Sequence, residues 1–273
     1  MIVCSSHGLF CFHDSFSPPN QSQTKRAVIW NPTIGKSVDI YMPNVLDTPS
    51  HCKTVIGFWG CPRTCDAKLV KITLPMPWGT ISKRVEVFTL KTGFWRSSRS
   101  NSLPRQSVMF NRKQVVIDEF IYWLAEDFFC VDGRLQNPYL IISFDMISEE
   151  FVELHLPESI KRSGSCLCIS KLKESLVVAA TSGSNLPVWI MQNGDPKSFT
   201  PIFTINSPNT PIRDLLGFTE SGEPVFVKET KLNEDELFVY EPNSKQIKST
   251  GIFGALNSFS LCSYAETLLV RDH

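Results

Sequence analysis

The chain has 273 residues, with 27 Lys and Arg against 27 Asp and Glu, and 42% of its residues are hydrophobic. The formal net charge is +0 and no long stretch is dominated by one sign, which argues against the basic face that nucleic acid binding requires. This composition excludes wholesale disorder, and no apolar run reaches the roughly 18 residues needed to cross a bilayer. We predict one domain over residues 1–273, without nucleic acid or membrane as a partner.

The cysteine pattern indicates a reducing compartment. Nine cysteines, an odd number, lie at irregular positions. The opening segment MIVCSSHGLFCF has neither a basic n-region nor a cleavage-type apolar stretch. We therefore expect free thiols and an intracellular location, cytoplasmic or nuclear.

The first predicted strand is GLFCF, Gly8 to Phe12, and it has no evident neighbour in the sequence. The last apolar run of the chain is TLLV, Thr267 to Val270. We expect these two segments to pair, because a ring of sheets closed in this way leaves no strand edge open.

A hairpin phrase follows the first strand and recurs along the chain. Each copy has one apolar run, one turn and one further run, and the copies begin at intervals of 47 to 57 residues. Period-two alternation and frequent prolines favour strands over helices. The five copies are VIWNPTIGKSVDIYMP from Val28, VEVFTLKTGFWRSS from Val85, IISFDMISEEFVELHLP from Ile141, VWIMQNGDPKSFTPIFTI from Val188 and LFVYEPNSKQIKSTGI from Leu237.

Two short apolar runs follow a hairpin, such as VIGF from Val55 and LVKITL from Leu69. Four strands at this spacing are typical of a propeller blade. A single four-stranded sheet exposes two faces, whereas sheets stacked around an axis cover one another. The predicted fold is therefore all-β, a β-propeller-like ring of about five or six four-stranded units.

The stretches between these runs are candidate contact loops. We predict irregular structure from Gly60 to Ala67 and from Asp127 to Tyr139, among others. Aromatic and arginine side chains in loops suit protein-binding hot spots, although buried anchors are the alternative. The predicted partner-binding residues are Trp59, Arg63, Trp78, Phe128, Phe129 and Arg134.

Reactive centres are not evident. The nearest approach to a zinc site is the set His51, Cys52, Cys61 and Cys65, in which adjacent His51 and Cys52 suit one tetrahedral ion poorly. The five histidines lie in no catalytic phrase, and the chain has no Gly-x-Ser-x-Gly elbow and no phosphate-binding glycine pattern. We expect no catalytic residue, no metal and no cofactor.

Read in order, these phrases resemble the plant F-box associated domain, which is grouped with kelch-type propellers. The resemblance covers nearly the whole chain and adds SSHGLFCF, GFWGCPRTCDAKLVKIT, FIYWLAED and LLGFTESGEPVFVKE to the hairpins. Ala67 stands where the family has an aromatic residue, and Phe199 where it has a Trp. The resemblance implies the substrate-recognition half of a Skp-cullin-F-box ubiquitin ligase receptor.

In that family an F-box precedes the domain, whereas this sequence starts at Met1 inside the domain. We therefore expect no binding of a Skp-type adaptor to this chain. The leading hypothesis is a non-catalytic module that binds a protein partner or degradation target. The alternatives are a truncated remnant that binds targets without delivering them, and a hydrolase that gathers carboxylates such as Glu86, Asp145 and Asp214 at the ring's centre.

Overall fold

The computed structural model describes most of the chain. The chain divides into two compact units: Met1–Trp123, Ile142–Val152 and Cys262–His273 form the first, and Leu124–Ile141 and Glu153–Leu261 form the second. Each unit is treated separately below. The described residues are 2–13, 26–43, 52–61, 63–64, 66–75, 83–99, 105, 107–161, 166–192, 198–208, 210–231 and 234–269.

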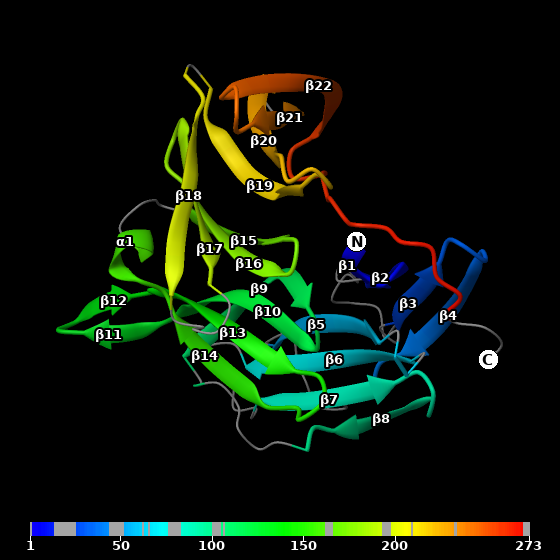
Figure 1. The fold of residues 1–273 in the computed structure, drawn as a ribbon. Coiled ribbons are helices and arrows are strands. Elements are labelled where there is room, and N and C mark those ends of the chain that lie inside the picture. The colour runs from blue at the N-terminus through cyan, green and yellow to red at the C-terminus, as the bar shows by residue number, and fades with distance from the viewer. Residues whose placement is uncertain are drawn as a thin grey trace. The chain divides into compact units, whose positions relative to one another are not determined.

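The described residues form an all-β structure with five four-stranded sheets, which confirms the predicted fold class and the lower of the two predicted sheet numbers (Figure 1). In the first unit, sheet 1 has the order β1-β2-β3-β4 and sheet 2 the order β5-β6-β7-β8. Their strands are β1 (Ile2–Ser6), β2 (Leu9–His13), β3 (Arg26–Asn31), β4 (Lys36–Tyr41), β5 (Cys52–Cys61), β6 (Asp66–Pro75), β7 (Arg84–Thr89) and β8 (Phe94–Ser97).

The third sheet has the order β14-β13-β10-β9, and the division between the two units passes through its strands. A separate two-stranded sheet, β11-β12, lies in the connection between β10 and β13. The strands are β9 (Val108–Ile117), β10 (Phe120–Asp127), β11 (Phe129–Val131), β12 (Arg134–Gln136), β13 (Tyr139–Asp145) and β14 (Phe151–His155).

Sheets 4 and 5 belong to the second unit and have the orders β15-β16-β17-β18 and β19-β20-β21-β22. The short helix α1 (Glu158–Lys161) precedes them. Their strands are β15 (Cys166–Leu172), β16 (Ser175–Thr181), β17 (Asn185–Met191), β18 (Phe199–Asn206), β19 (Ile212–Phe218), β20 (Pro224–Lys231), β21 (Glu234–Glu241) and β22 (Gln246–Ala255).

Each recurrent hairpin phrase forms the third and fourth strands of one sheet. VIWNPTIGKSVDIYMP, for example, supplies β3 and β4, whose register pairs Asn31 with Lys36. The predicted grouping of each hairpin with the two apolar runs after it was wrong. The two runs before a hairpin share its sheet, and the runs after it begin the next sheet. VIGF and LVKITL therefore belong with the second hairpin, not the first.

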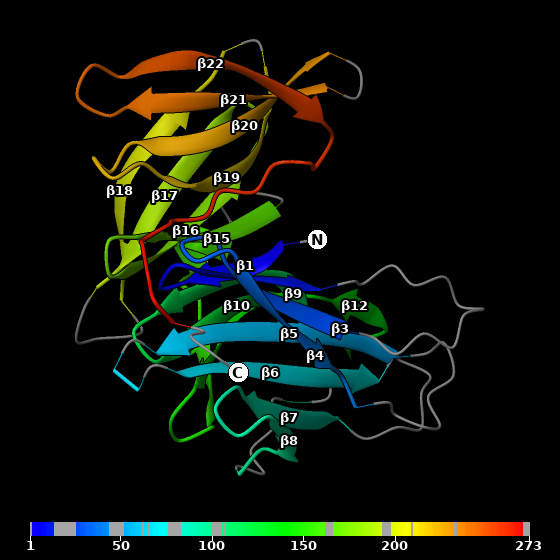
Figure 2. The ribbon, with the colours of Figure 1, turned by 90° about the vertical axis from the view of Figure 1, so that its right-hand side faces the viewer.

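The predicted pairing of the first and last runs is also wrong. β2 lies between β1 and β3 in sheet 1, so both of its edges are occupied. The segment IVCSS, which we did not predict as a strand, supplies β1. Residues 267–269 form no strand, and Val270 lies outside the described residues. Residues 262–269 nevertheless belong to the first unit and run against sheet 1 (Figure 2).

Four of the five hairpins place a residue of positive φ at the fifth position of the turn. These residues are Gly35, Gly93, Glu149 and Lys245. In two of the turns the N–H of this residue donates to the carbonyl of the first, from Gly93 to Thr89 at 3.0 Å and from Glu149 to Asp145 at 2.8 Å. Glycine adopts positive φ without a steric penalty, but other residues do not. The glutamate and the lysine are therefore strained where the two glycines are not.

Apolar residues between neighbouring sheets form the core of each unit. In the first unit, Leu9 and Ile29 of sheet 1 pack in one cluster with Phe58 and Leu69 of sheet 2. In the second unit a separate cluster joins sheets 4 and 5. Burial of this kind contributes roughly 25 cal/mol per Å² of apolar surface, and it is the reason for repeating the sheet.

Gly57 in β5 provides a test of this packing. A Cβ atom at this position would lie 2.6 Å from Cζ2 of Trp123 and 2.6 Å from Cγ1 of Val70, both of which are buried. We expect Gly57→Ala to lower the free energy of unfolding by about 2 kcal/mol, because a filled core accommodates no extra methyl group. Urea unfolding measures the change. Ser37→Ala at an exposed strand position is the control, and equal stability of the two variants would contradict the packing described here.

Candidate protein-binding surface

The structure places Trp59 inside the fold rather than in a loop. The residue lies in β5, is buried, and its indole Nε1 donates to the Asp118 carbonyl at 2.8 Å. The ammonium of Lys68 lies over the ring, 5.6 Å from its centroid. The prediction that Trp59 is an exposed aromatic residue in a loop is therefore wrong. Its indole anchors the turn between β9 and β10.

Arg63, the other predicted partner-binding residue near Trp59 in the sequence, is exposed. Arg63 lies in the turn between β5 and β6, and its guanidinium forms an ion pair with Glu119. β5 and β6 extend to Cys61 and Asp66, so the predicted loop shortens to a tight turn. Trp78 lies outside the described residues.

The remaining predicted residues, Phe128, Phe129 and Arg134, lie together in one hairpin. The stretch from Asp127 to Tyr139, predicted to be irregular, contains β11 and β12, which pair antiparallel with Phe129 opposite Gln136. Asp132 and Gly133 form the two-residue turn, with φ values of 50° and 74°. Two positive φ values in succession define a type I′ turn, for which Asp-Gly is a favoured sequence.

Both faces of this hairpin are exposed. All six strand residues lie on the surface, and the apolar members have exposed fractions of 39% for Phe129, 48% for Val131 and 65% for Leu135. Phe128, directly before β11, is exposed to 38%. Pairing places Val131 opposite Arg134 and Cys130 opposite Leu135, so each face presents an apolar side chain.

The base of the hairpin is tied to its sheet by polar contacts. The Asp127 N–H donates to the Pro138 carbonyl at 3.0 Å, and the Asn137 Nδ2 donates to the Glu126 carboxylate at 3.0 Å. Burial, assisted by the negative charge of Glu126, raises the pKa of Tyr139. The hairpin therefore leaves a well-connected base and presents its apolar residues beyond it. We call residues 128–136 the β11–β12 arm.

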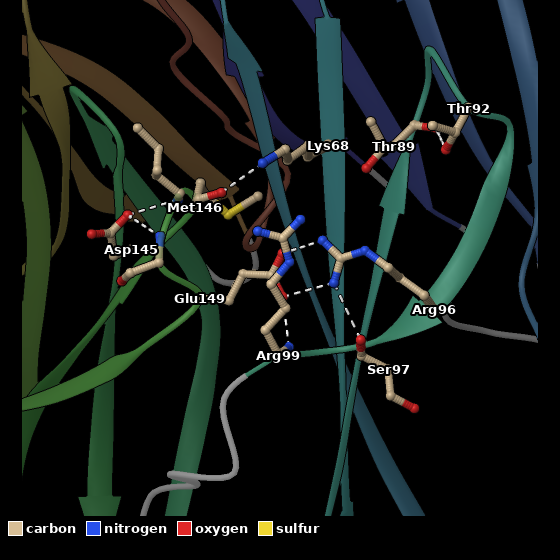
Figure 3. Close-up of polar contacts among 11 residues, drawn as sticks. Lys68, Thr89, Thr92, Arg96, Ser97, Arg99, Asp145, Met146 and Glu149 are labelled. Carbon is tan, nitrogen blue, oxygen red and sulfur yellow. Dashed lines mark hydrogen bonds and ion pairs between the residues drawn. The ribbon is translucent and has the colours of Figure 1, made fainter.

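A second feature, which the sequence analysis missed, is the contact between β8 and the turn before β14 (Figure 3). The Glu149 carboxylate is almost completely buried. It accepts two hydrogen bonds from the Arg96 guanidinium, one of them 2.8 Å from Nη1 to Oε2. The Arg99 N–H donates to the same carboxylate at 2.8 Å. Bidentate charge-assisted bonds of this kind are among the stronger polar contacts in proteins.

The same turn makes further contacts with sheet 2 and with the β9–β10 turn. The Lys68 ammonium donates to the Met146 carbonyl at 2.7 Å (Figure 3). The Met146 N–H donates to the Glu119 carbonyl at 2.9 Å. Asp145 accepts from the N–H groups of Ile147 and Ser148. These side chains are occupied by contacts within the fold. We therefore assign a structural role to this cluster.

The carboxylates named for the hydrolase alternative also have local partners. Asp145 caps its own turn, as described above, and Glu86 in β7 forms an ion pair with Lys71 at 2.8 Å. Asp214 lies in β19 of the second unit. In the first unit, the structure thus gives Glu86 and Asp145 separate local roles and does not bring them into one acid–base pair.

The candidate zinc ligands do not come together either. Cys52 and Cys61 are the first and last residues of β5, so roughly 30 Å of extended strand separates them. His51 and Cys65 lie outside the described residues. Within the described ranges, no group of three or more His, Cys, Asp or Glu side chains is placed to hold a metal. In the same part of the chain, no helix has the length and apolar character of a membrane span.

Comparison with known families identifies the chain. The sequence profile described as the F-box associated beta propeller domain matches residues 1–273. The chain therefore belongs to this family of protein-interaction propeller domains, as the hairpin phrases indicated. A search of the curated proteins finds no significant match.

Two solved structures are similar to parts of this chain. The Aleuria aurantia lectin, solved as a point mutant in complex with alpha-methyl-L-fucoside, has 13% identity and a TM-score of 0.45 over 76% of this chain and 65% of the lectin. The β-propeller domain of the Trilobed protease from Pyrococcus furiosus has 8% identity and a TM-score of 0.48 over 89% of this chain and 65% of that one. The chain thus spans slightly less than two thirds of the length of both.

The Arg96–Glu149 contact predicts an acid-sensitive contribution to stability. Burial alone would raise the pKa of Glu149, but the hydrogen bonds and positive charge of Arg96, with the Arg99 N–H, overcome it and hold the pKa below its ordinary value. A carboxyl group with a lowered pKa stabilises the fold above its unfolded pKa of about 4.3, and this stabilisation is lost as the pH falls through the folded value.

We expect Glu149→Gln to lower the free energy of unfolding at pH 7 by about 2 kcal/mol, because a neutral amide replaces the charged acceptor. The difference from the parent protein should shrink as the pH falls below about 4.3 towards the lowered folded pKa, since the unfolded parent takes up a proton on this carboxyl group before the folded parent does. Urea unfolding at a series of pH values measures both effects. A difference that stays constant down to about pH 3 would contradict the assignment of a lowered pKa.

Proposed function

We propose that the chain is a non-catalytic protein-binding module and that the β11–β12 arm contacts its target. The observation that carries the proposal is the exposure of Phe128, Phe129, Val131 and Leu135, with Arg134 among them, on a two-stranded ribbon. Contiguous exposed apolar residues mark interaction sites, and aromatic and arginine residues are enriched at binding hot spots.

The position of these residues supports a role in binding a partner rather than in stabilising the fold. A two-stranded ribbon that is exposed on both faces buries little apolar surface and adds little stability of its own. The polar contacts at its base already fix where it leaves the sheet. The apolar side chains of the arm are thus available to a partner.

Family membership gives the biological setting. The F-box associated propeller family consists of protein-interaction domains, and in F-box proteins they bind the substrates of a ubiquitin ligase. We propose that the arm binds a degradation target in this sense. Delivery of the target to the ligase requires an adaptor-binding F-box in addition, and the proposal concerns residues 1–273.

The test replaces apolar side chains of the arm with charged ones. We expect the double variant Val131→Asp and Leu135→Asp to weaken target binding by about tenfold or more, because two apolar contacts are replaced by charges that must be desolvated. The free energy of unfolding should change by less than about 0.5 kcal/mol, since both side chains are exposed. The readouts are isothermal titration against a target recovered by crosslinking and urea unfolding.

The matched control is Ile252→Asp in β22, which replaces an apolar residue of similar exposure, 53%, in the same unit. It should leave target affinity unchanged. Exposed Cys130 provides an independent readout, because a bound target should slow its alkylation. Equal affinity of the arm variant and the control, with no protection of Cys130, would assign the target to another surface.

A further inference from the structure

The C-terminal segment of the described chain, Ser263–Leu269, lies against sheet 1. We call this stretch the strap, and the residues of sheet 1 beneath it the strap site. The strap forms no strand, and side chains of sheet 1 make polar contacts to its backbone. The Ser5 hydroxyl donates to the Ser263 carbonyl at 3.0 Å, and the Thr267 N–H donates to the Thr33 hydroxyl at 3.2 Å.

Asn31 is the central residue of the strap site. Its side chain is completely buried, and its Nδ2 donates to the carbonyls of both Thr267 and Leu269, at 3.0 and 2.6 Å. Its Oδ1 accepts from the Thr33 N–H at 2.9 Å, so donor and acceptor are both used. The two carbonyl oxygens converge on one nitrogen, so they lie closer together than alternate carbonyls of a β-strand, which are roughly 6.6 Å apart. The amide thus recognises the backbone of the strap, whatever side chains that backbone carries.

Side-chain recognition occurs at both ends of the strap. The Leu269 side chain is 7% exposed and packs with Leu9 and Ile29 in the core cluster of the first unit. The Tyr264 ring stacks on Phe10, with centroids 6.1 Å apart, and its hydroxyl lies 2.8 Å from that of Thr33. The residues between these two anchors are largely exposed.

The strap site is shaped for backbone contact at Gly8. This residue has a φ of +79°, and a Cβ atom there would lie 2.0 Å from the Ala265 carbonyl oxygen. Any side chain at this position would therefore displace the strap. Three features together form a site for a peptide segment: Gly8 beneath the backbone, a buried amide that binds two backbone carbonyls, and an apolar contact for one leucine.

We propose that the strap site is a peptide-binding site, that the strap occupies it in cis, and that a peptide with the Tyr-x-x-Thr-x-Leu pattern of residues 264–269 replaces the strap in trans. The site is separate from the β11–β12 arm and does not depend on the function proposed for it. A tethered segment has an effective concentration in roughly the millimolar range, so the strap masks the site from weaker ligands.

The experiment uses a fluorescent peptide with the sequence SYAETLL of residues 263–269, acetylated and amidated because both ends continue in the chain. Fluorescence anisotropy measures its binding to the full chain and to the Leu269→Ala chain, in which the strap has lost its apolar anchor. We expect the Leu269→Ala chain to bind at least about tenfold more tightly than the parent, since the cis competitor is weakened.

Two controls define the site. A peptide with Leu269→Asp should not bind, because a carboxylate cannot enter the apolar cluster without losing its hydration. Adding Asn31→Ala to the Leu269→Ala chain should remove binding of the SYAETLL peptide, because the backbone carbonyls then lose their donor. A folded Leu269→Ala chain that shows no anisotropy change up to about 1 mM peptide, within the range of cis effective concentrations, would overturn the proposal.

A second measurement covers the case in which Leu269→Ala does not fold. Hydrogen exchange of the parent chain is followed by mass spectrometry with and without excess SYAETLL peptide. Replacement in trans should accelerate exchange in residues 263–269 and leave β3 and β4 protected. Unchanged exchange in the strap at saturating peptide would show that the site accepts only its own chain, and this too would overturn the proposal.

Discussion

Burial of apolar side chains between neighbouring four-stranded sheets is the interaction on which the rest of the structure depends. A sheet of four strands has two faces, and water can remain on only one of them if the sheet is to be stable. The clusters around Leu9 and Phe58 in the first unit, and around Val188 and Phe226 in the second, show how adjacent sheets satisfy this requirement. The hairpins, the β8 contact and the strap all attach to this arrangement.

The hairpins were predictable from sequence because their signals are local. Alternating apolar residues and a positive-φ turn glycine lie within about ten residues of one another, and this combination marks β3–β4 and β7–β8 correctly. The assignment of runs to sheets was not predictable in this way. Whether VIGF pairs within the preceding or the following sheet depends on contacts between distant residues, and the strand IVCSS was missed for the same reason.

The candidate protein-binding surface was also predictable only in part. Phe128, Phe129 and Arg134 were selected for their chemistry, and the structure places them in one exposed ribbon, although the region was predicted to be irregular. Trp59 had the same local appearance, a tryptophan beside a glycine, yet it is buried and its indole bonds to a turn of another sheet. Glu149 occupies the turn position that glycine holds in the first two hairpins. Alignment of the hairpins would have identified this position as unusual, but not its partner Arg96.

Polar contacts distinguish the cluster around Glu149, which has a structural role, from the β11–β12 arm. In the first unit, Glu149, Asp145 and Lys68 use their hydrogen-bonding capacity on neighbouring turns. The backbone strain of a glutamate at positive φ is tolerated there because several hydrogen bonds hold the carboxylate. The β11–β12 arm has few such contacts beyond its base. Its apolar residues therefore distinguish it as a surface for recognition.

The strap also has a consequence for synthesis of the protein on the ribosome. Sheet 1 emerges first, yet the buried amide of Asn31 finds its two acceptors only in Thr267 and Leu269, which are 236 and 238 residues further along the chain. Until then a polar group inside the earliest sheet lacks these partners, at a cost comparable to a lost hydrogen bond. The nascent first unit is thus less stable than the complete one until residues 267–269 have been synthesised.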